Sequence, residues 1–166
     1  VGAGSMKVIT TGNDNTAVGY WSQYGASITG DFNTSVGSNS LKNLVSGDKN
    51  ISVGHEAGDV ITSGSNNVII GTGSDPSASS ASNQTVIGYN VTGQADNSVT
   101  LGNADVTDIY MAQDKGATVH AAGADLSGST GLILENDETI TNSTDGMVLI
   151  NGTIAGGTGS AAGVFT

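Results

Sequence analysis

Asn15-Thr16-Ala17-Val18-Gly19 is the stretch that decides the fold, because close copies of it recur as far as Gly102. The copies are Asn33-Thr34-Ser35-Val36-Gly37, Asn50-Ile51-Ser52-Val53-Gly54, Asn67-Val68-Ile69-Ile70-Gly71, Gln84-Thr85-Val86-Ile87-Gly88 and Ser98-Val99-Thr100-Leu101-Gly102. Counted from Gly2, which fits the tail of an earlier copy, the glycines are 17, 18, 17, 17, 17 and 14 residues apart. Self-similarity at a fixed period is the signature of a repeat architecture.

The period excludes helical repeats, because two helices and their turns need about 33 residues. Seventeen residues hold two short strands and two bends. Each early copy also follows a turn-forming triplet, in which Gly supplies positive φ and Asp or Asn bonds nearby backbone. These triplets are Gly12-Asn13-Asp14, Gly30-Asp31-Phe32, Gly47-Asp48-Lys49 and Gly64-Ser65-Asn66. The sequence therefore predicts an all-β fold, a parallel β-solenoid whose backbone hydrogen bonds join successive turns.

Alternation within each copy predicts which side chains fill the solenoid. The large apolar residues before the glycines are predicted to stack as the repeat core: Val18, Val36, Val53, Ile70, Ile87 and Leu101. The glycines themselves are the predicted repeat turns: Gly19, Gly37, Gly54, Gly71, Gly88 and Gly102. Ile28, Val45 and Ile61 are predicted to supply the facing wall. Such a roll is thin, with open ends and one partly apolar face, so lateral association around an axis is expected.

With its preceding turn triplet, the stretch Asn15–Tyr20 resembles the head repeats of trimeric autotransporter adhesins, and more closely the 17-residue version in bacteriophage tail fibres. Residues 99–111 and 116–123 are similar to segments that end such repeats in phage fibre-like proteins. The resemblance implies a left-handed, homotrimeric parallel β-roll used for attachment. The chain departs from the pattern at Gln84, which replaces Asn, and in the Ser/Ala-rich segment 73–83, where Pro76 marks a longer loop.

The 17-residue rhythm stops after Gly102, which divides the chain into a β-roll at 1–103 and a second region at 104–166. Short apolar runs separated by Gly, Asp and Asn predict short strands there. They lie at 106–111, 131–134, 146–150 and 153–154. We expect this Gly-rich shaft or connector to form a β-prism or an intertwined β-shaft of three chains.

Composition excludes several classes of function. The 166 residues include 26 Gly, one Pro, no Cys and four Lys plus Arg, with a net charge of −11. So few cations make a nucleic-acid partner improbable, and an acidic chain is repelled by anionic lipid. Without cysteine there is neither a disulfide nor a thiolate zinc site. No apolar run approaches the roughly 18 residues of a membrane span, so membrane insertion is not expected.

The titratable residues do not predict an enzyme. His55 follows a repeat glycine at an expected surface position, and His120 has no partner pattern near it. Asp14, Asp31 and Asp48 recur with the turn, which indicates backbone bonding rather than catalysis. The acidic groups at 103–108 and 135–138 do not match an EF-hand, and no metal or cofactor is predicted.

Tyr20, Trp21 and Tyr24 are the candidate receptor contacts, because exposed aromatic rings stack on sugars and anchor protein partners. The alternative is that Trp21 shields the end of the roll or packs against another chain. Taken together, we expect a non-enzymatic, extracellular structural and host-attachment segment of a phage tail fibre, with a cell-surface glycan or protein as receptor. A bacterial autotransporter head on the cell surface is the alternative, and an ice- or surface-binding solenoid ranks lower.

Overall fold

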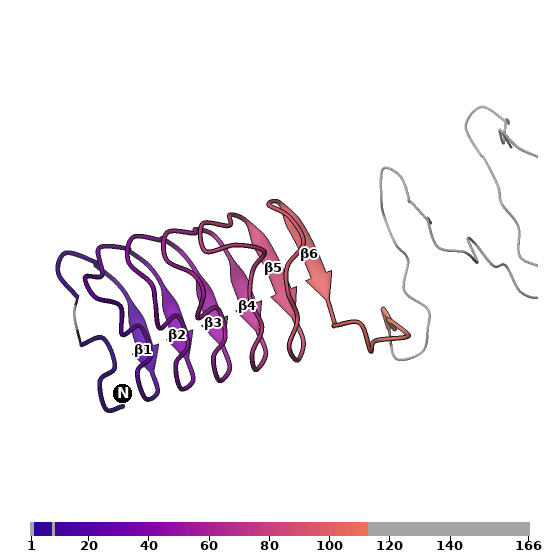
Figure 1. The fold of residues 1–166 in the computed structure, drawn as a ribbon, viewed down its shortest axis with the longest axis horizontal. Coiled ribbons are helices and arrows are strands. Elements are labelled where there is room, and N and C mark those ends of the chain that lie inside the picture. Colours follow the sequence, from indigo (N-terminus) through magenta and orange to yellow (C-terminus); the bar gives the residue numbers. More distant parts are fainter. Residues whose placement is uncertain (1, 8, 113–166) are drawn as a thin grey trace, which may run out of the picture. The chain divides into compact units, whose positions relative to one another are not determined.

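The computed structural model describes residues 2–7 and 9–112, and these form a parallel β-solenoid (Figure 1). Six short strands lie side by side in the order of the sequence, and every neighbouring pair is parallel. They are β1 (Thr16–Val18), β2 (Thr34–Val36), β3 (Ile51–Val53), β4 (Val68–Ile70), β5 (Gln84–Ile87) and β6 (Ser98–Leu101). The described residues include no helix.

The strand register confirms the predicted repeat. Thr16 pairs with Thr34, Thr34 with Ile51, and Ile51 with Val68, so successive turns stack at the period seen in the sequence. The last turn is shorter, because Gln84 pairs with Ser98. Each pair of strands is therefore joined by one complete turn of chain.

The repeat glycines are needed where each strand ends. Gly19, Gly37, Gly54, Gly71 and Gly88 have φ between 134° and 143°, a conformation that side-chain-bearing residues rarely adopt. A Cβ on any of the first four would also collide with the backbone of the glycine one turn further on. The sequence prediction that these glycines make the repeat turns fits this geometry.

The prediction that the six large residues before the repeat glycines form the core is wrong, because their side chains face solvent. Val18, Val36, Val53, Ile70, Ile87 and Leu101 point outward, and each exposes 38–44% of its surface. The residue before each of them faces inward instead, and this inner column consists of Ala17, Ser35, Ser52, Ile69, Val86 and Thr100. A 17-residue turn encloses little space, and the opposite wall already fills it, so the strand contributes mostly small side chains.

The opposite wall supplies most of the buried apolar volume. Ile28 and Ile61 are fully buried, as predicted, whereas Val45 is exposed and that prediction is wrong. Leu41 and Leu44 take the place expected of Val45, and they join one buried cluster with Ile61, Ile69 and Val86. Buried serines dominate the first turns: the Ser40 hydroxyl donates to the Ser52 carbonyl (3.1 Å), and the Ser52 hydroxyl donates to the Ala57 carbonyl (2.6 Å). The interior thus changes from polar to apolar along the solenoid.

A ladder of buried amides runs beside the sheet, formed by the residue that opens each repeat. The Oδ1 atoms of Asn15, Asn33, Asn50 and Asn67 each accept the backbone N–H of the next ladder residue, at 2.8–3.1 Å. Their Nδ2 atoms each donate to a carbonyl at the preceding bend of the following turn, at 2.7–2.8 Å. Adjacent Asn side chains also bond each other at 3.0 Å. The repeated Asn therefore pairs backbone groups that the thin interior would otherwise leave unpaired.

Gln84 ends this ladder and explains the departure from the Asn pattern. Its N–H still donates to Asn67 Oδ1 (3.0 Å), but its longer side chain reaches into the long loop. There, Nε2 donates to Ser77 Oγ (2.6 Å) and Asp96 Oδ1 (3.2 Å), while Oε1 accepts the Ser77 N–H (3.0 Å). The extra methylene thus lets the Gln84 amide group hydrogen-bond to the loop that contains Pro76.

Among the described residues, no strand follows β6. The strand predicted at 106–111 is not formed, and the side chains of Val106, Ile109 and Met111 are exposed. The Val106 N–H instead donates to the Asn103 carbonyl three residues earlier (3.2 Å), which is a local bond and not a strand pairing. The remaining predicted strands, and nearly all of the predicted shaft region, lie outside the described residues.

The ladder predicts a large cost for Asn50→Ala. This substitution leaves the buried Asn67 N–H and Gly64 carbonyl without the Asn50 side chain, which is expected to lower the free energy of unfolding by about 3 kcal/mol. Urea unfolding at a fixed protein concentration measures it. The control is Asn43→Ala, because Asn43 is exposed and its side chain donates one bond, to the Asp59 carbonyl. Equal losses for the two variants would contradict a stabilising ladder.

Candidate functional site

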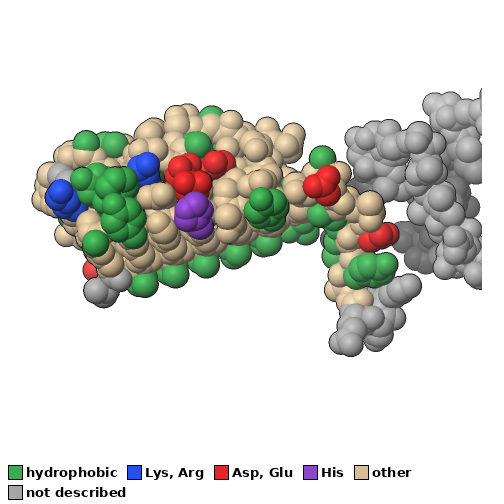
Figure 2. All heavy atoms as spheres, turned by 60° about the horizontal axis from the view of Figure 1, so that its bottom comes forward, with side chains coloured by type: hydrophobic (Ala, Val, Ile, Leu, Met, Phe, Trp, Pro, Cys, Tyr) green, Lys and Arg blue, Asp and Glu red, His purple; other side chains and the backbone are tan. Residues whose placement is uncertain are grey.

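The outer face of the sheet carries an uninterrupted apolar stripe along its whole length. We call outer stripe the six outward residues that precede the repeat glycines: Val18, Val36, Val53, Ile70, Ile87 and Leu101. A second outward column runs parallel to it, two residues earlier on each strand, and consists of Thr16, Thr34, Ile51, Val68, Thr85 and Val99. Neither column contains a charged side chain. Figure 2 shows a row of hydrophobic side chains along the lower edge of the solenoid. Contiguous exposed apolar surface of this kind marks an interaction site.

The three aromatic residues singled out from the sequence come together at the first bend after β1. The rings of Tyr20 and Trp21 stack with centroids 4.7 Å apart, and those of Trp21 and Tyr24 with centroids 5.1 Å apart. Lysines from the neighbouring turns lie over them: Lys42 Nζ is 5.6 Å from the Trp21 ring, and Lys7 Nζ is 5.5 Å from the Tyr24 ring. We call these five residues the aromatic patch. Figure 2 shows it as a hydrophobic cluster with lysines on both sides, near the N-terminal end.

The backbone under Trp21 is in a left-handed conformation that favours Gly or Asn. The position two residues after each repeat glycine has positive φ in every turn that the structure describes up to Asn90. Its occupants are Gly4, Trp21, Asn39, Glu56, Gly73 and Asn90, with φ from 50° to 72°. Only Trp21 and Glu56 are neither Gly nor Asn, and left-handed backbone costs such residues on the order of 1–2 kcal/mol. Trp21 is therefore not there to satisfy the backbone.

Next to the aromatic patch, the solenoid gathers acidic side chains that sequence reasoning missed. Burial, and then the charge of Asp59, raises the pKa of Asp75 to about 6. Burial also raises the pKa of Asp59, with a further contribution from Glu56 and an opposing one from Lys42. His55 is exposed, as expected, with Nδ1 3.8 Å from Glu56 Oε2. The repeat register could have found this group, because Asp59 and Asp75 follow their repeat glycines by five and four residues.

Two of the three turn acids, Asp31 and Asp48, bond backbone as the sequence indicated, but they do so between turns, while the prediction for Asp14 stays a prediction. Asp31 Oδ1 accepts the Asn13 N–H (2.6 Å), and Asp48 Oδ1 accepts the Asp31 N–H (2.8 Å). Ser65 Oγ continues the series by accepting the Asp48 N–H (3.0 Å). These carboxylates therefore have a structural role at the bends.

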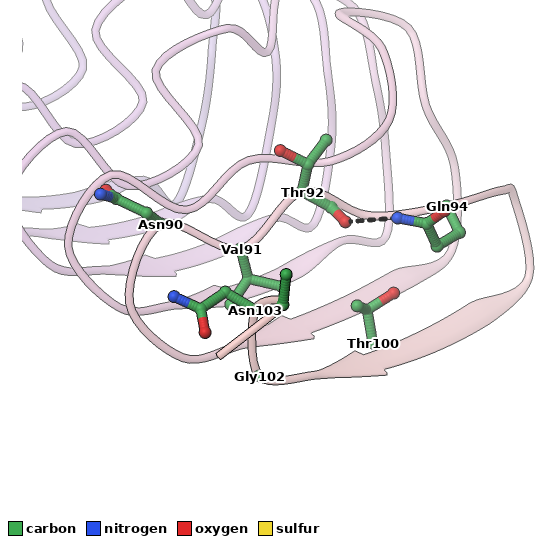
Figure 3. A pocket seen from close by; sticks show the side chains of 8 residues that line it. Asn90, Val91, Thr92, Gln94, Thr100, Gly102 and Asn103 are labelled. Carbon is green, nitrogen blue, oxygen red and sulfur yellow. Dashed lines mark hydrogen bonds between the residues drawn. The ribbon is translucent and has the colours of Figure 1, made fainter. Parts of the chain in front are cut away.

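A hollow of about 400 Å³ lies at the last turn (Figure 3). Its lining is uncharged and consists of Asn90, Val91, Thr92, Gln94, Thr100, Gly102, Asn103 and Ala104. One of its side chains is tied to the wall, because Gln94 Nε2 donates to the Thr92 carbonyl (3.0 Å). The hollow offers hydrogen-bonding groups but no acid, base or nucleophile with a shifted pKa.

Two further observations concern the described part of the chain. Within it, no three histidine, aspartate or glutamate side chains are grouped so that they could hold a metal ion. No helix in residues 2–7 and 9–112 has the length and apolar character to cross a membrane. His120 and the acidic residues at 135–138 lie outside these ranges.

Comparisons of the chain with protein-family models, with curated proteins and with solved structures found no match. The outer stripe and the aromatic patch are therefore the features of the molecule that bear on its function.

The raised pKa of Asp75 predicts a pH-dependent stability. Because folding raises this pKa above 3.8, ionisation of Asp75 disfavours the folded state; the penalty is complete above about pH 6 and disappears below about pH 4. Asp75→Asn removes the penalty, so it is expected to raise the free energy of unfolding at pH 7.5 by about 1 kcal/mol, since partial exposure screens the effect. The gain should shrink toward pH 4.

Thermal unfolding of both proteins between pH 4 and pH 8 measures this difference. Asp105→Asn, at an exposed position beyond β6, is the control for the loss of one negative charge. A gain from Asp75→Asn that does not change with pH would contradict the assignment.

Proposed function

We propose that this chain is a non-enzymatic segment of a homotrimeric attachment fibre, of the kind found in bacteriophage tail fibres. In this proposal the solenoid is a left-handed roll, and three copies stand side by side with their sheets facing a common axis. The observation that carries the proposal is the outer stripe, an uncharged apolar row that one chain leaves exposed along all six strands.

A second and a third copy of this chain are the partners that fit the stripe best. The stripe repeats at the ~4.8 Å spacing of neighbouring strands, so identical chains aligned in parallel match it turn by turn. Burying the exposed remainder of each Val, Ile or Leu contributes on the order of 0.5–1 kcal/mol, and the contributions add along the stripe. An unrelated partner would need the same spacing and the same lack of charge. The threefold symmetry itself comes from the resemblance of the repeats to those of trimeric fibres.

Attachment would then be mechanical and multivalent. Every turn is hydrogen-bonded to the next through the strands, and the turns up to β5 also through the amide ladder, which favours a stiff segment. Three chains would present three copies of the aromatic patch, so that weak contacts with a cell-surface receptor add up. The net charge of −11 would keep such fibres soluble and apart.

A bacterial trimeric autotransporter head would use the same roll and the same stripe, and it remains the alternative, with the bacterial surface in place of the virion. An ice-binding face is less well supported, because it calls for a regular threonine array. The second outward column has Thr at 16, 34 and 85 but Ile or Val at 51, 68 and 99.

The mass of the chain in solution tests the proposal, and Val53→Asp sharpens the test. Light scattering coupled to size exclusion is expected to give three times the 16.3 kDa chain mass. Val53 is exposed in the single chain, so an isolated solenoid would tolerate Asp there, whereas a trimer would bury three carboxylates together and dissociate. Val45→Asp is the matched control, because Val45 has almost the same exposure (39% against 38%) but lies off the stripe.

We expect the Val45 variant to keep the trimer mass and the Val53 variant to lose it. A folded monomer of the unmodified chain, or a Val53→Asp variant that keeps the parent mass, would contradict the trimer.

A further inference from the structure

One exposed column of the solenoid carries an aromatic or imidazole ring in every second turn. The column is the position directly after the repeat glycine, and after strands β1 to β5 it holds Tyr20, Ser38, His55, Thr72 and Tyr89. Tyr20 and Tyr89 expose 49% and 65% of their surface, and the His55 side chain exposes 53%. We call Tyr20, His55 and Tyr89 the ring row. Figure 2 shows a hydrophobic cluster, a histidine and a further hydrophobic side chain in one line along the solenoid.

Backbone hydrogen bonds between turns fix the spacing of the ring row. Each column residue from Tyr20 to Thr72 offers its carbonyl to the following turn. The Tyr20 carbonyl accepts the Asn39 N–H and the His55 carbonyl accepts the Gly73 N–H, both at 2.9 Å. The column is thus stacked turn on turn. Two turns of ~4.8 Å place neighbouring members of the ring row roughly 10 Å apart along the axis.

This interval fits a straight sugar chain with β-1,4 linkages. Each sugar in such a chain is turned over relative to the one before it, so the same ring face recurs at every second sugar, at close to two turns of the solenoid. Aromatic rings stack on the C–H face of a sugar. The ring row would therefore contact the first, third and fifth sugars of one chain. Ser38 and Thr72, between the rings, are small enough to leave room for the second and the fourth.

The charges beside the ring row favour an uncharged ligand. Glu56 Oε2 lies 3.8 Å from His55 Nδ1, and Glu56 and Lys42 both act on the charge of Asp59. The carboxylates repel a polyanion, as does the net charge of −11, and Lys42 opposes a polycation. The hydroxyl groups of an uncharged sugar can donate to the carboxylates and accept from the ammonium group.

The ring at the N-terminal end of the row is held in place by its neighbours. Tyr20 stacks on Trp21, and Trp21 stacks on Tyr24. Trp21 also lies against Gly4 of the preceding turn, where an added Cβ would be 2.6 Å from Trp21 Cδ1. A ring fixed in this way loses little freedom when a ligand stacks on it.

We propose that the ring row binds an uncharged β-1,4-linked polysaccharide, which lies along the solenoid axis with alternate sugars stacked on Tyr20, His55 and Tyr89. The inference rests on the proposed attachment function and deepens it by naming the class of receptor. All three rings belong to one chain, so a single solenoid makes the complete contact, and a trimer would add avidity.

Three hexasaccharides test the linkage. Cellohexaose and N-acetylchitohexaose are uncharged and β-1,4-linked, whereas maltohexaose has the same sugar as cellohexaose in α-1,4 linkage, which makes the chain coil. Calorimetric titration of the full chain is expected to give at least tenfold tighter binding for one of the two β-linked hexamers than for maltohexaose. Cellobiose, which reaches one ring of the row, should bind at least tenfold more weakly than cellohexaose or its N-acetyl analogue. Equal binding of maltohexaose, or binding of neither β-linked hexamer, would overturn the proposal.

Two variants remove one ring each without disturbing the solenoid. His55→Ser and Tyr89→Thr install the residues that the preceding turns carry at the same position, Ser38 and Thr72, so their melting temperatures should match the parent. Each is expected to weaken binding of the β-linked hexamer at least fivefold. Phe32→Asn is the control, because Phe32 is also an exposed aromatic (53%) but lies at the opposite bend, before β2. Parent-like binding by both ring variants, or an equal loss in Phe32→Asn, would refute the ring row.

Moving one ring by a single turn tests the spacing itself. The double variant His55→Ser/Thr72→Tyr keeps three rings but separates them by three turns and one turn, so it should bind as weakly as His55→Ser alone. His55→Tyr keeps the spacing with a larger ring and should bind at least as tightly as the parent. Binding restored by Thr72→Tyr, or lost in His55→Tyr, would contradict the spacing argument.

The solution mass of each sample separates this proposal from the trimer. A trimer that binds neither β-linked hexamer refutes the ring row and leaves the fibre standing. A folded monomer that binds one of them refutes the trimer and supports the ring row.

Discussion

The structure depends on one constraint, which is that a chain coiled in turns of about 17 residues must pair its buried backbone groups with the next turn. Parallel strands of three or four residues satisfy only part of each turn. The amide ladder satisfies the corner before each strand, because an Asn side chain presents a donor and an acceptor about as far apart as those of a peptide unit. At the corner after each strand, the repeat glycines let the backbones of successive turns approach closely. The 17-residue period is thus the spacing at which these corners stack.

The same constraint explains why the sequence predicted the period and the register but not the facing of the strands. Alternation divides a strand into two faces, and it does not say which face is inside. The larger residues were assigned to the interior because hydrophobic residues are usually buried. In so narrow a coil, however, Leu41, Leu44 and Ile61 from the opposite wall fill the space, and Ser35 and Ser52 suffice on the strand. The β-branched residues were left for the outer face, where they form an intermolecular surface if the trimer proposal holds.

The candidate sites differ in how many of their residues could be predicted from the sequence. Tyr20, Trp21 and Tyr24 could be selected as a group, because aromatics are rare in this chain and these three are close in sequence. Their lysine partners were missed, because Lys7 and Lys42 come from other turns and contact the rings only when the turns are stacked in register. The raised pKa of Asp75 was hidden for the same reason, since it depends on burial and on Asp59 one turn away. Counting residues from the repeat glycines would have predicted that the lysines lie near the aromatic rings and that Asp59 lies near Asp75.

The solenoid separates two kinds of surface, and this separation supports reading one for self-association and the other for a partner. The outer stripe is nearly the same in every turn, varying only among Val, Ile and Leu. A surface that repeats along an axis is matched best by another copy of itself. Each turn then makes the same apolar contact, and no turn meets an unfavourable side chain on the partner. The bends after the strands instead vary from turn to turn, from the stacked rings at Trp21 to the acidic group at Glu56. Specific recognition needs a bend whose side chains differ from those of the other turns. A repeat protein can change the side chains of one bend freely, because its backbone hydrogen bonds, and not its exposed side chains, hold the turns together.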